Sequence, residues 1–362
     1  MPGLAGPNSS GLDLANEAQL RALAQQMAES AGVQWSAAPL LAREASSVPL
    51  ADAPAPQAVR NPAQHQDVVG TVQEAGVLAT DQALADAAAF APTWAATSPA
   101  ERAAMLERAA DALEADMPRL LGLLAREAGK TCANGVAEVR EAVDFLRYYA
   151  VQARSAFDSY VPASLGPVVC ISPWNFPLAI FTGQVAAALA AGNPVLAKPA
   201  EQTPLIAAEA VRVLWAAGIP QAALQLLPGR GEVVGARLVA DARVQGVMFT
   251  GSTEVARILQ RTLAQRLGAH GQPVPLIAET GGQNAMIVDS SALAEQVVAD
   301  VVASAFDSAG QRCSALRVLC VQEDAAERIV QMLKGAMAEL QLGAPRARPW
   351  PTRAARPRCR PL

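Results

Sequence analysis

The stretch Gly166-Pro-Val-Val-Cys-Ile-Ser-Pro-Trp-Asn-Phe-Pro177 opens the part of the chain that decides the fold. Its apolar run at residues 168–172 predicts a short buried strand. Similar runs follow at 194–198, 224–227 and 246–250, and helical runs alternate with them at 183–191, 204–217, 232–240 and 254–267. This alternation predicts an α/β fold with a doubly wound parallel sheet and right-handed crossovers. Ligands of such sheets bind at the carboxyl ends of the strands.

Helices are expected before the sheet. Ser98-Pro-Ala-Glu101 predicts a helix start, because Ser98 can cap, Pro99 suits the first turn and Glu101 stands at the capping-box position. A second helix is expected over residues 116–129. A third is indicated by an apolar stripe, interpreted as scaffold packing, at Val139, Val143, Leu146 and Ala150.

Composition and charge exclude several classes of protein. The 362 residues carry a formal net charge of −4, and the last nineteen hold six Arg and no acid, so the rest of the chain is acidic. No basic stripe indicates a nucleic-acid partner. The N-terminus has no basic segment followed by an apolar core, so secretion is not indicated. The apolar run 176–197 is interrupted at Gln184 and at residues 192–194, and it predicts a helix, a turn and a strand rather than a membrane span.

The cysteines and histidines limit the available chemistry. Cysteines at positions 132, 170, 313, 320 and 359 form no C-x-x-C pair, and their odd number fits reduced thiols in a cytoplasmic protein. His65 and His270 lie in loop-like surroundings and are expected at the surface. We therefore predict no metal site.

A candidate nucleophile lies in Ser308-Ala-Gly-Gln-Arg-Cys-Ser314, between a helical run and the strand-like run 316–321. A helix terminus, a nearby cation or backbone N–H groups can favour the thiolate of Cys313. The alternative is a small buried hydrophobic residue. Glu279 lies in Leu276-Ile-Ala-Glu-Thr-Gly-Gly-Gln-Asn284, at the end of an apolar strand, where it could instead cap the following glycines. Asn175 follows the first strand of the sheet, in a Pro-x-Asn context that is also common in turns.

A dinucleotide site is predicted without the usual glycine fingerprint. Gly229, Gly231 and Gly235 approximate it only loosely and could equally form a turn. In Phe249-Thr-Gly-Ser-Thr-Glu254 a strand ends at Gly251 and a helix begins at Ser252, which offers free N–H groups to a pyrophosphate, although Ser252 could be a simple N-cap. Lys198-Pro-Ala-Glu201 puts a cation and a carboxylate at the same sheet edge, or a solvated surface pair.

These segments, in this order and spacing, resemble the aldehyde dehydrogenase superfamily over roughly residues 60–343. Longer runs are similar to the glutamate semialdehyde dehydrogenase module of the bifunctional proline utilization A proteins. They are Arg126-Glu-Ala-Gly-Lys130, Glu138-Val-Arg-Glu-Ala-Val-Asp-Phe-Leu-Arg-Tyr-Tyr149, Gly310-Gln-Arg-Cys-Ser-Ala-Leu-Arg317 and the opening Asn8-Ser-Ser-Gly-Leu-Asp-Leu-Ala-Asn-Glu17. The resemblance implies a Rossmann-like aldehyde dehydrogenase fold and the NAD-dependent oxidation of L-glutamate γ-semialdehyde to L-glutamate in proline degradation.

The resemblance also implies a role for each site residue. Cys313 would attack the aldehyde, the Asn175 amide and the Cys313 backbone N–H would bind the oxyanion, and Glu279 would activate the deacylating water. Phe176 and Ser314 would bind the substrate. Lys198 and Glu201 would bind the adenosine ribose, and Glu201 would repel a 2′-phosphate, so NAD is preferred over NADP. The remaining expected cofactor-binding residues are Ile171, Ser172, Pro173, Trp174, Gly231, Phe249, Thr250, Gly251, Ser252, Val255 and Gly281.

Four parts of the chain are predicted. Residues 1–60 hold one helix, at 16–29, and a Pro- and Ala-rich linker at 46–59. Residues 61–275 form the NAD-binding domain with its N-terminal helices, and 276–343 form a partial catalytic α/β domain. Residues 344–362, with six Arg and five Pro, form a disordered tail.

The family resemblance stops at Gly343, and the expectation is a C-terminally truncated copy. A Glu-x-Phe motif for the nicotinamide ribose, a substrate-anchoring loop and the strand through which full-length relatives oligomerise are expected to be missing. A shifted reading frame would explain the tail, and an intact frame at the locus would refute that explanation. Poor solubility is expected, because truncation exposes apolar surface. Two alternatives to the semialdehyde dehydrogenase are a non-catalytic nucleotide-binding remnant and a broader-specificity aldehyde dehydrogenase.

Overall fold

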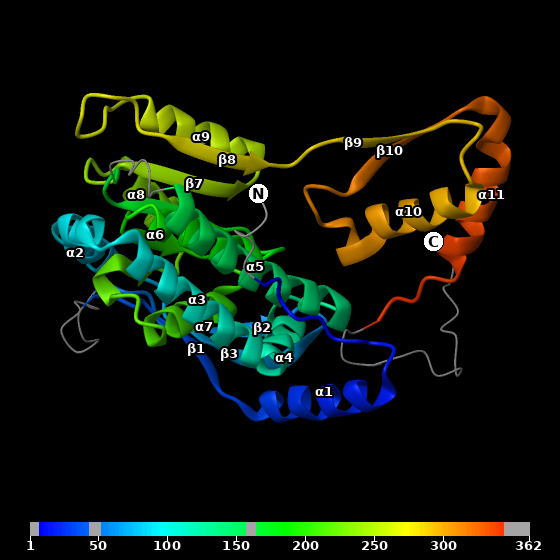
Figure 1. Cartoon of the computed structure of the whole chain (residues 1–362), viewed down its shortest axis with the longest axis horizontal. Coiled ribbons are helices and arrows are strands. Elements are labelled where there is room, and N and C mark those ends of the chain that lie inside the picture. The colour runs from blue at the N-terminus through cyan, green and yellow to red at the C-terminus, as the bar shows by residue number, and fades with distance from the viewer. Residues whose placement is uncertain (1–6, 43–51, 157–163, 344–362) are drawn as a thin grey trace.

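A computed structural model describes residues 7–42, 52–156 and 164–343 of the chain. Its largest sheet has five strands, all parallel, in the order β6-β5-β4-β7-β8 (Figure 1). The strands are β4 (Val168–Ile171), β5 (Val195–Lys198), β6 (Leu224–Leu226), β7 (Gly246–Gly251) and β8 (Leu276–Thr280). The predicted α/β class and the four predicted strands are confirmed. The chain order reverses at β4, so a topological switch point lies between β4 and β7.

The sheet extends past the boundary predicted at residue 275. β8 pairs with β7 over its whole length and ends with Glu279 opposite Thr250 and Thr280 opposite Gly251. The sequence placed residues 276–280 in the second domain, but an isolated apolar run does not indicate which sheet it will join. Glu279 is therefore held by the same sheet edge as Thr250.

Helices cover both faces of this sheet, as alternating strand residues require. Val168 and Cys170 belong to one hydrophobic core and Val169 to another, so successive residues of β4 face opposite sides of the sheet. The helices that alternate with the strands are α6 (Ala179–Ala190), α7 (Pro204–Ala216), α8 (Ala236–Ala240) and α9 (Thr253–Leu263). Short helical turns add η3 (Gln221–Ala223) and η4 (Gly231–Gly235). Within the described residues, none of the helices combines the length and the apolarity needed to span a bilayer.

The helices before the sheet begin where local signals predict. They are α2 (Val77–Ala96), α3 (Pro99–Ala115), α4 (Met117–Glu127) and α5 (Cys132–Ala156). The predicted capping box is present, with Glu101 N donating to Ser98 Oγ (3.2 Å) and Ser98 N donating to Glu101 Oε2 (3.1 Å). All four residues of the predicted stripe are buried on α5. Helix α2, which is rich in Ala and includes Pro92, was not predicted.

The N-terminal part confirms one prediction and corrects another. Helix α1 (Glu17–Glu29) starts at Asn16, whose side chain accepts from the N–H groups of Ala18 and Gln19. A small sheet follows, of β1 (Trp35–Ala37), β2 (Gln57–Asn61) and β3 (Gln64–Val72), and η1 (Ser30–Gly32) joins α1 to β1. The linker predicted at 46–59 is wrong for residues 57–59, which pair with β3. That stretch has little apolar bulk of its own, and its partner strand supplies the pairing; residues 43–51 lie outside the described part.

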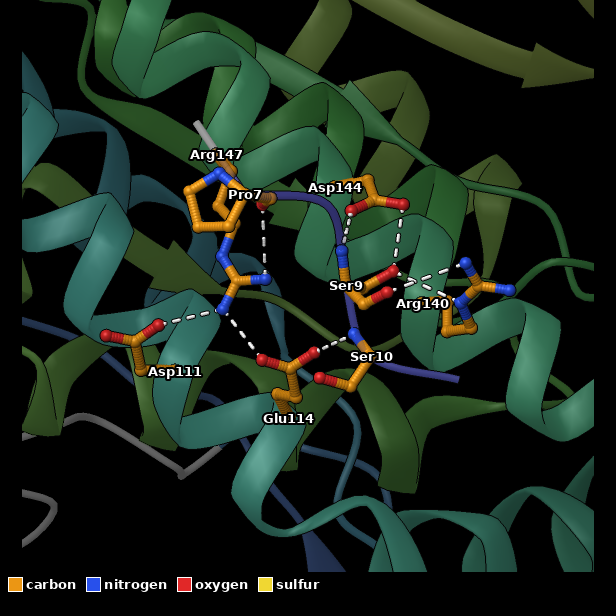
Figure 2. A network of polar contacts seen from close by, with 8 residues as sticks. All are labelled: Pro7, Ser9, Ser10, Asp111, Glu114, Arg140, Asp144 and Arg147. Carbon is orange, nitrogen blue, oxygen red and sulfur yellow. Dashed lines mark hydrogen bonds and ion pairs between the residues drawn. The ribbon is translucent and has the colours of Figure 1, made fainter. Parts of the chain in front are cut away.

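The segment before α1 is fastened to α3 and α5 by a polar network (Figure 2). The Ser9 N–H and hydroxyl donate to the two carboxylate oxygens of Asp144 at 2.6 and 2.9 Å, and Arg140 Nε donates to Ser9 Oγ at 3.3 Å. The Ser10 N–H donates to Glu114 Oε1, and Arg147, which pairs with Asp111 and Glu114 at 2.9 and 2.7 Å, donates to the Pro7 carbonyl at 3.4 Å. These contacts hold residues 7–10 against α3 and α5.

A second, smaller α/β unit follows β8. It contains the parallel pair β9 (Asn284–Val288) and β10 (Leu316–Val321), with α10 (Ala294–Phe306), η5 (Asp307–Gly310) and α11 (Glu323–Ala338). Its core is formed by Val288, Val297, Val301, Leu316 and Ile329. Figure 1 shows this unit to one side of the five-stranded sheet, joined to it by the connection from β8 to β9. The predicted tail, residues 344–362, lies outside the described part.

Helix α7 receives its N-terminal cap from α4. Thr203 makes no capping hydrogen bond, and the fully buried carboxyl of Glu127 instead accepts from the N–H groups of Leu205 (2.6 Å) and Ile206 (2.9 Å). Replacing Glu127 with alanine should lower the free energy of unfolding by about 2–4 kcal/mol, because two buried donors lose their acceptor and a cavity forms. Denaturant unfolding followed by tryptophan fluorescence measures the loss. The exposed Glu295→Gln change should cost less than about 1 kcal/mol.

The same residue should make stability depend on pH. Burial raises the pKa of Glu127 from 4.5 to about 8, although its two backbone hydrogen bonds oppose the shift. Between these values the folded chain keeps a proton that the unfolded chain has lost, so this stabilising contribution is present below pH 4.5 and disappears as pH rises through 8. The stability of the wild type relative to Glu127→Gln should therefore fall between pH 6 and pH 8. A constant difference would contradict this assignment.

Candidate active site

Cys313 lies in an exposed turn immediately before β10. The preceding residues Ser308, Ala309 and Gly310 have φ angles of 53°, 54° and 68°, a left-handed conformation that is costly for residues with a Cβ. Arg317 stabilises it by donating from Nη2 to the Gly310 carbonyl at 2.6 Å. The alternative of a buried hydrophobic cysteine is therefore wrong for Cys313, whereas Cys170 is buried and burial raises the pKa of its thiol.

Arg312 supports the turn from the side of α10. Its Nη2 donates to the carbonyls of Ala303 (2.8 Å) and Ser304 (3.0 Å), and its Nη1 lies 3.4 Å from Asp307 Oδ2. Asn134 Nδ2, from the start of α5, donates to Asp307 Oδ1 at 2.8 Å. The guanidinium of Arg312 is thus held by the C-terminal end of α10. Asn134 links α5 to Asp307, the residue that begins the turn.

Two asparagines reach the cysteine loop from other elements. Asn175, in the loop after β4, donates from Nδ2 to the Gln311 carbonyl at 2.8 Å, two residues before Cys313. Because a carboxamide has two N–H donors, one remains for another acceptor. Asn284, the first residue of β9, donates from Nδ2 to the carbonyls of Cys313 (2.7 Å) and Ala315 (3.0 Å). The sequence does not indicate this role of Asn284, because only the fold brings its side chain to the cysteine loop.

Glu279 is exposed near the carboxyl end of β8. The loop that follows β8 passes beside the cysteine loop: a Cβ on Gly282 would lie 4.0 Å from the Cys313 carbonyl oxygen, in ordinary van der Waals contact. Glu279 thus lies three residues before the glycine that is placed beside the Cys313 carbonyl. The role of Glu279 as a base remains a prediction.

Lys198 and Glu201 do not form the solvated surface pair considered above. Lys198 is only 3% exposed, at the end of β5, and its Nζ donates to the Pro199 carbonyl at 3.1 Å. Burial lowers the pKa of its ammonium, and the charges of Glu201, Glu74 and Glu232 oppose that shift. Glu201 is exposed, and its Oε1 accepts from the Gly231 N–H at 2.7 Å.

The start of α9 has the geometry expected of a backbone cradle. Ser252 is its N-cap and accepts from Val255 N at 3.2 Å, so the simple capping role exists. A Cβ on Gly251 would lie 2.5 Å from the Phe249 ring, so this position requires glycine. Thr250 Oγ1 accepts from Gln184 Nε2 at 3.0 Å, and Gln184 Oε1 is buried without a hydrogen-bond partner among the described residues.

The other predicted cofactor-binding residues lie along the loops at this edge. Ser172 is buried and its N–H donates to the Lys198 carbonyl at 3.2 Å, whereas Trp174 is 40% exposed. Ile171 and Pro173 are partly buried, and Gly281 is exposed in the loop after β8. This edge thus combines carboxyl ends of parallel strands, a helix N-terminus and a buried cation, which suits a dinucleotide.

The two predicted substrate-binding residues lie in the loops that Asn175 joins. Ser314 is exposed beside Cys313, and Phe176 is partly buried with its ring centroid 4.4 Å from Lys130 Nζ. His65 and His270 are exposed, as predicted, but His65 lies in strand β3 and not in a loop. Among the described residues, no group of three or more His, Cys, Asp or Glu side chains could hold a metal ion. Cys359 lies outside that part of the chain.

The fold and the site together define a doubly wound α/β protein. Its exposed cysteine lies in a second α/β unit, next to the edge of the sheet that suits a dinucleotide. The chain belongs to the aldehyde dehydrogenase family, whose sequence profile matches residues 50–351. This confirms the family resemblance inferred from the motifs.

Several known proteins of this kind are similar to the chain. The bifunctional protein PutA of Klebsiella aerogenes is 63% identical over 338 residues, which are 93% of this chain and 25% of that protein. The 1-pyrroline-5-carboxylate dehydrogenase of Bacillus mycoides is 37% identical over 303 residues, 80% of this chain and 58% of that one. A 1-pyrroline-5-carboxylate dehydrogenase from Thermus, solved with bound NAD, superposes with a TM-score of 0.87 at 30% identity, covering 95% of this chain and 69% of that one. This chain therefore spans about a quarter of the first relative.

Proposed function

We propose that this chain carries the chemistry of an NAD-dependent aldehyde dehydrogenase that oxidises L-glutamate γ-semialdehyde to L-glutamate, as in proline degradation. The observation that carries the proposal is the hydrogen bond from Asn175 to Gln311, which brings an amide donor to the loop of an exposed cysteine. Kinship with PutA and with 1-pyrroline-5-carboxylate dehydrogenases supports the choice of substrate. A cytoplasmic location is also proposed, and the reduced cysteines support it.

The residues at the sheet edge fit NAD. Gly251 lets a pyrophosphate approach the start of α9, and Gln184 Oε1, beside Thr250, is an acceptor with no partner in the part of the chain that the structure describes. Lys198 and Glu201 would bind the adenosine ribose, where the carboxylate disfavours a 2′-phosphate. Bound NAD would supply the hydride acceptor.

Cys313 would act first, as a thiolate that adds to the aldehyde carbonyl. The resulting oxyanion needs fixed donors, and the free N–H of Asn175 and the backbone N–H of Cys313 are proposed to provide them. Loss of hydride from the tetrahedral adduct leaves an acyl thioester on Cys313. Glu279 would then take a proton from the water that hydrolyses the thioester, which releases the acid and restores the thiol.

NADH formation measured at 340 nm tests the function. The chain should oxidise glutamate semialdehyde in preference to neutral short-chain aldehydes, and NAD should support a higher rate than NADP. Equal rates with all these aldehydes would instead indicate a broader-specificity dehydrogenase. Binding of NAD without turnover of any aldehyde would indicate a non-catalytic nucleotide-binding remnant and would refute the proposal.

A further inference from the structure

A buried ion pair lies directly behind the candidate site. Lys130, between α4 and α5, is 5% exposed, and Glu138, on α5, is 1% exposed. Lys130 Nζ lies 3.5 Å from Glu138 Oε1. The other carboxyl oxygen, Glu138 Oε2, accepts from the N–H of Ala179 at the start of α6 at 2.9 Å. Burying two charged groups is costly, and apolar side chains of similar volume can fill a core equally well, so this pair calls for a functional explanation.

The ammonium of the pair faces an aromatic ring that belongs to the site. Lys130 Nζ lies 4.4 Å from the centroid of the Phe176 ring, within the range of a cation–π contact. Phe176 directly follows Asn175, which is joined to the cysteine loop. Phe176 is only partly buried, whereas the ammonium that contacts its ring belongs to a residue that is 5% exposed.

The positive member of the pair is the one that contacts the Phe176 ring, whereas the carboxyl of Glu138 is held by the N–H of Ala179. Burial raises the pKa of Glu138 to about 7, while the charge of Lys130 and the Ala179 hydrogen bond oppose the shift. Because a low-dielectric interior screens charges weakly, the ammonium acts strongly on the ring at this short range.

We propose that Lys130 determines the specificity of the site for aldehydes that carry a carboxylate, by placing its ammonium behind the Phe176 ring. A cation on one face of an aromatic ring offsets the negative potential of the opposite face, where an anion can then approach. The aldehyde favoured is one that carries a carboxylate within a few carbons of the reacting carbonyl. This inference rests on the proposed function, because that function puts Phe176 beside the substrate.

Replacing Lys130 with methionine keeps the length of the side chain and removes its charge. With 5-oxopentanoate, a five-carbon aldehyde whose only charge is its carboxylate, the KM should rise roughly tenfold while kcat changes little, because the lost attraction acts on binding of the anion. With pentanal, a neutral aldehyde with the same number of carbons, both constants should stay near the wild-type values. Lys130→Arg should keep the preference. An equal loss with both aldehydes, or no change with either, would overturn the inference.

A second variant separates charge from structural damage. Glu138→Gln can still accept from the Ala179 N–H but removes the negative charge, so the preference for the anionic aldehyde should increase rather than fall. A weaker preference in Glu138→Gln would indicate that the pair is only structural and would overturn the inference. If Lys130→Met does not fold, the result with Glu138→Gln decides the question.

Failure of the proposed function would be recognised separately. If the wild-type chain does not oxidise glutamate semialdehyde or either of these aldehydes, the proposed function fails, and calorimetric titration with glutarate then tests Lys130 by itself. The wild type should bind glutarate roughly tenfold more tightly than Lys130→Met, since a tenfold change is the effect expected of one lost charge at this range. Equal affinities would overturn the inference.

Discussion

Cys313→Ser should abolish NADH formation from glutamate semialdehyde, with a loss in kcat/KM of at least about 10³-fold. A hydroxyl is almost entirely protonated at neutral pH, and the two histidines lie on other elements, His65 on β3 and His270 in the turn between α9 and β8, both exposed. The thiolate is the nucleophile on which every later step depends. Steady-state absorbance at 340 nm, with the folded state checked by circular dichroism, measures the loss.

Cys320→Ser is the matched control. Cys320 is also exposed and lies seven residues further along, on β10, outside the turn that holds Cys313. Its replacement should leave turnover within about twofold of the wild type, because surface changes away from the site have small effects. Equal losses in the two variants would refute a specific role for Cys313.

Glu279→Gln should separate the two halves of the reaction. The first half needs Cys313 and Asn175, so mixing the variant with semialdehyde and NAD should still give a burst of about one NADH per chain. Hydrolysis of the thioester lacks its base, so steady-state turnover should fall by roughly 10²–10⁴-fold. Stopped-flow absorbance records both phases in one experiment.

Glu295→Gln provides the control for this change. Glu295 is an exposed carboxylate in the same small α/β unit, paired with Arg328 at 2.9 Å. Its replacement should change neither the burst nor the steady-state rate. Loss of the burst in Glu279→Gln would contradict the assignment of Glu279 to hydrolysis alone.

The sequence predicts those parts of the fold that depend on local signals. The four short strands of the sheet are apolar runs bounded by turns, and Ser98 begins α3 through contacts within four residues. β2 could not be predicted, because residues 57–59 form a strand only through pairing with β3. Likewise, the membership of β8 in the large sheet is decided by its pairing with β7, which a strand's own residues do not encode.

The same distinction applies to the site. The exposed turn at Cys313 and the position of Asn175 after β4 follow from motifs in the chain. Asn284 and Lys130 reach the site through contacts between distant segments, so no spacing in the sequence indicates their partners. Lys198 was predicted at the correct edge, but its burial depends on the packing of the strands and helices around β5.

The central claim is that Cys313 forms a covalent acyl intermediate with the substrate, and mass spectrometry tests it most directly. Glu279→Gln is mixed with glutamate semialdehyde and NAD, quenched in acid during the burst and digested for peptide mapping. The account predicts an acyl adduct on the peptide that contains Cys313, in an amount that matches the NADH formed. A burst of NADH with an unmodified Cys313 peptide, or an adduct on another residue, would contradict it.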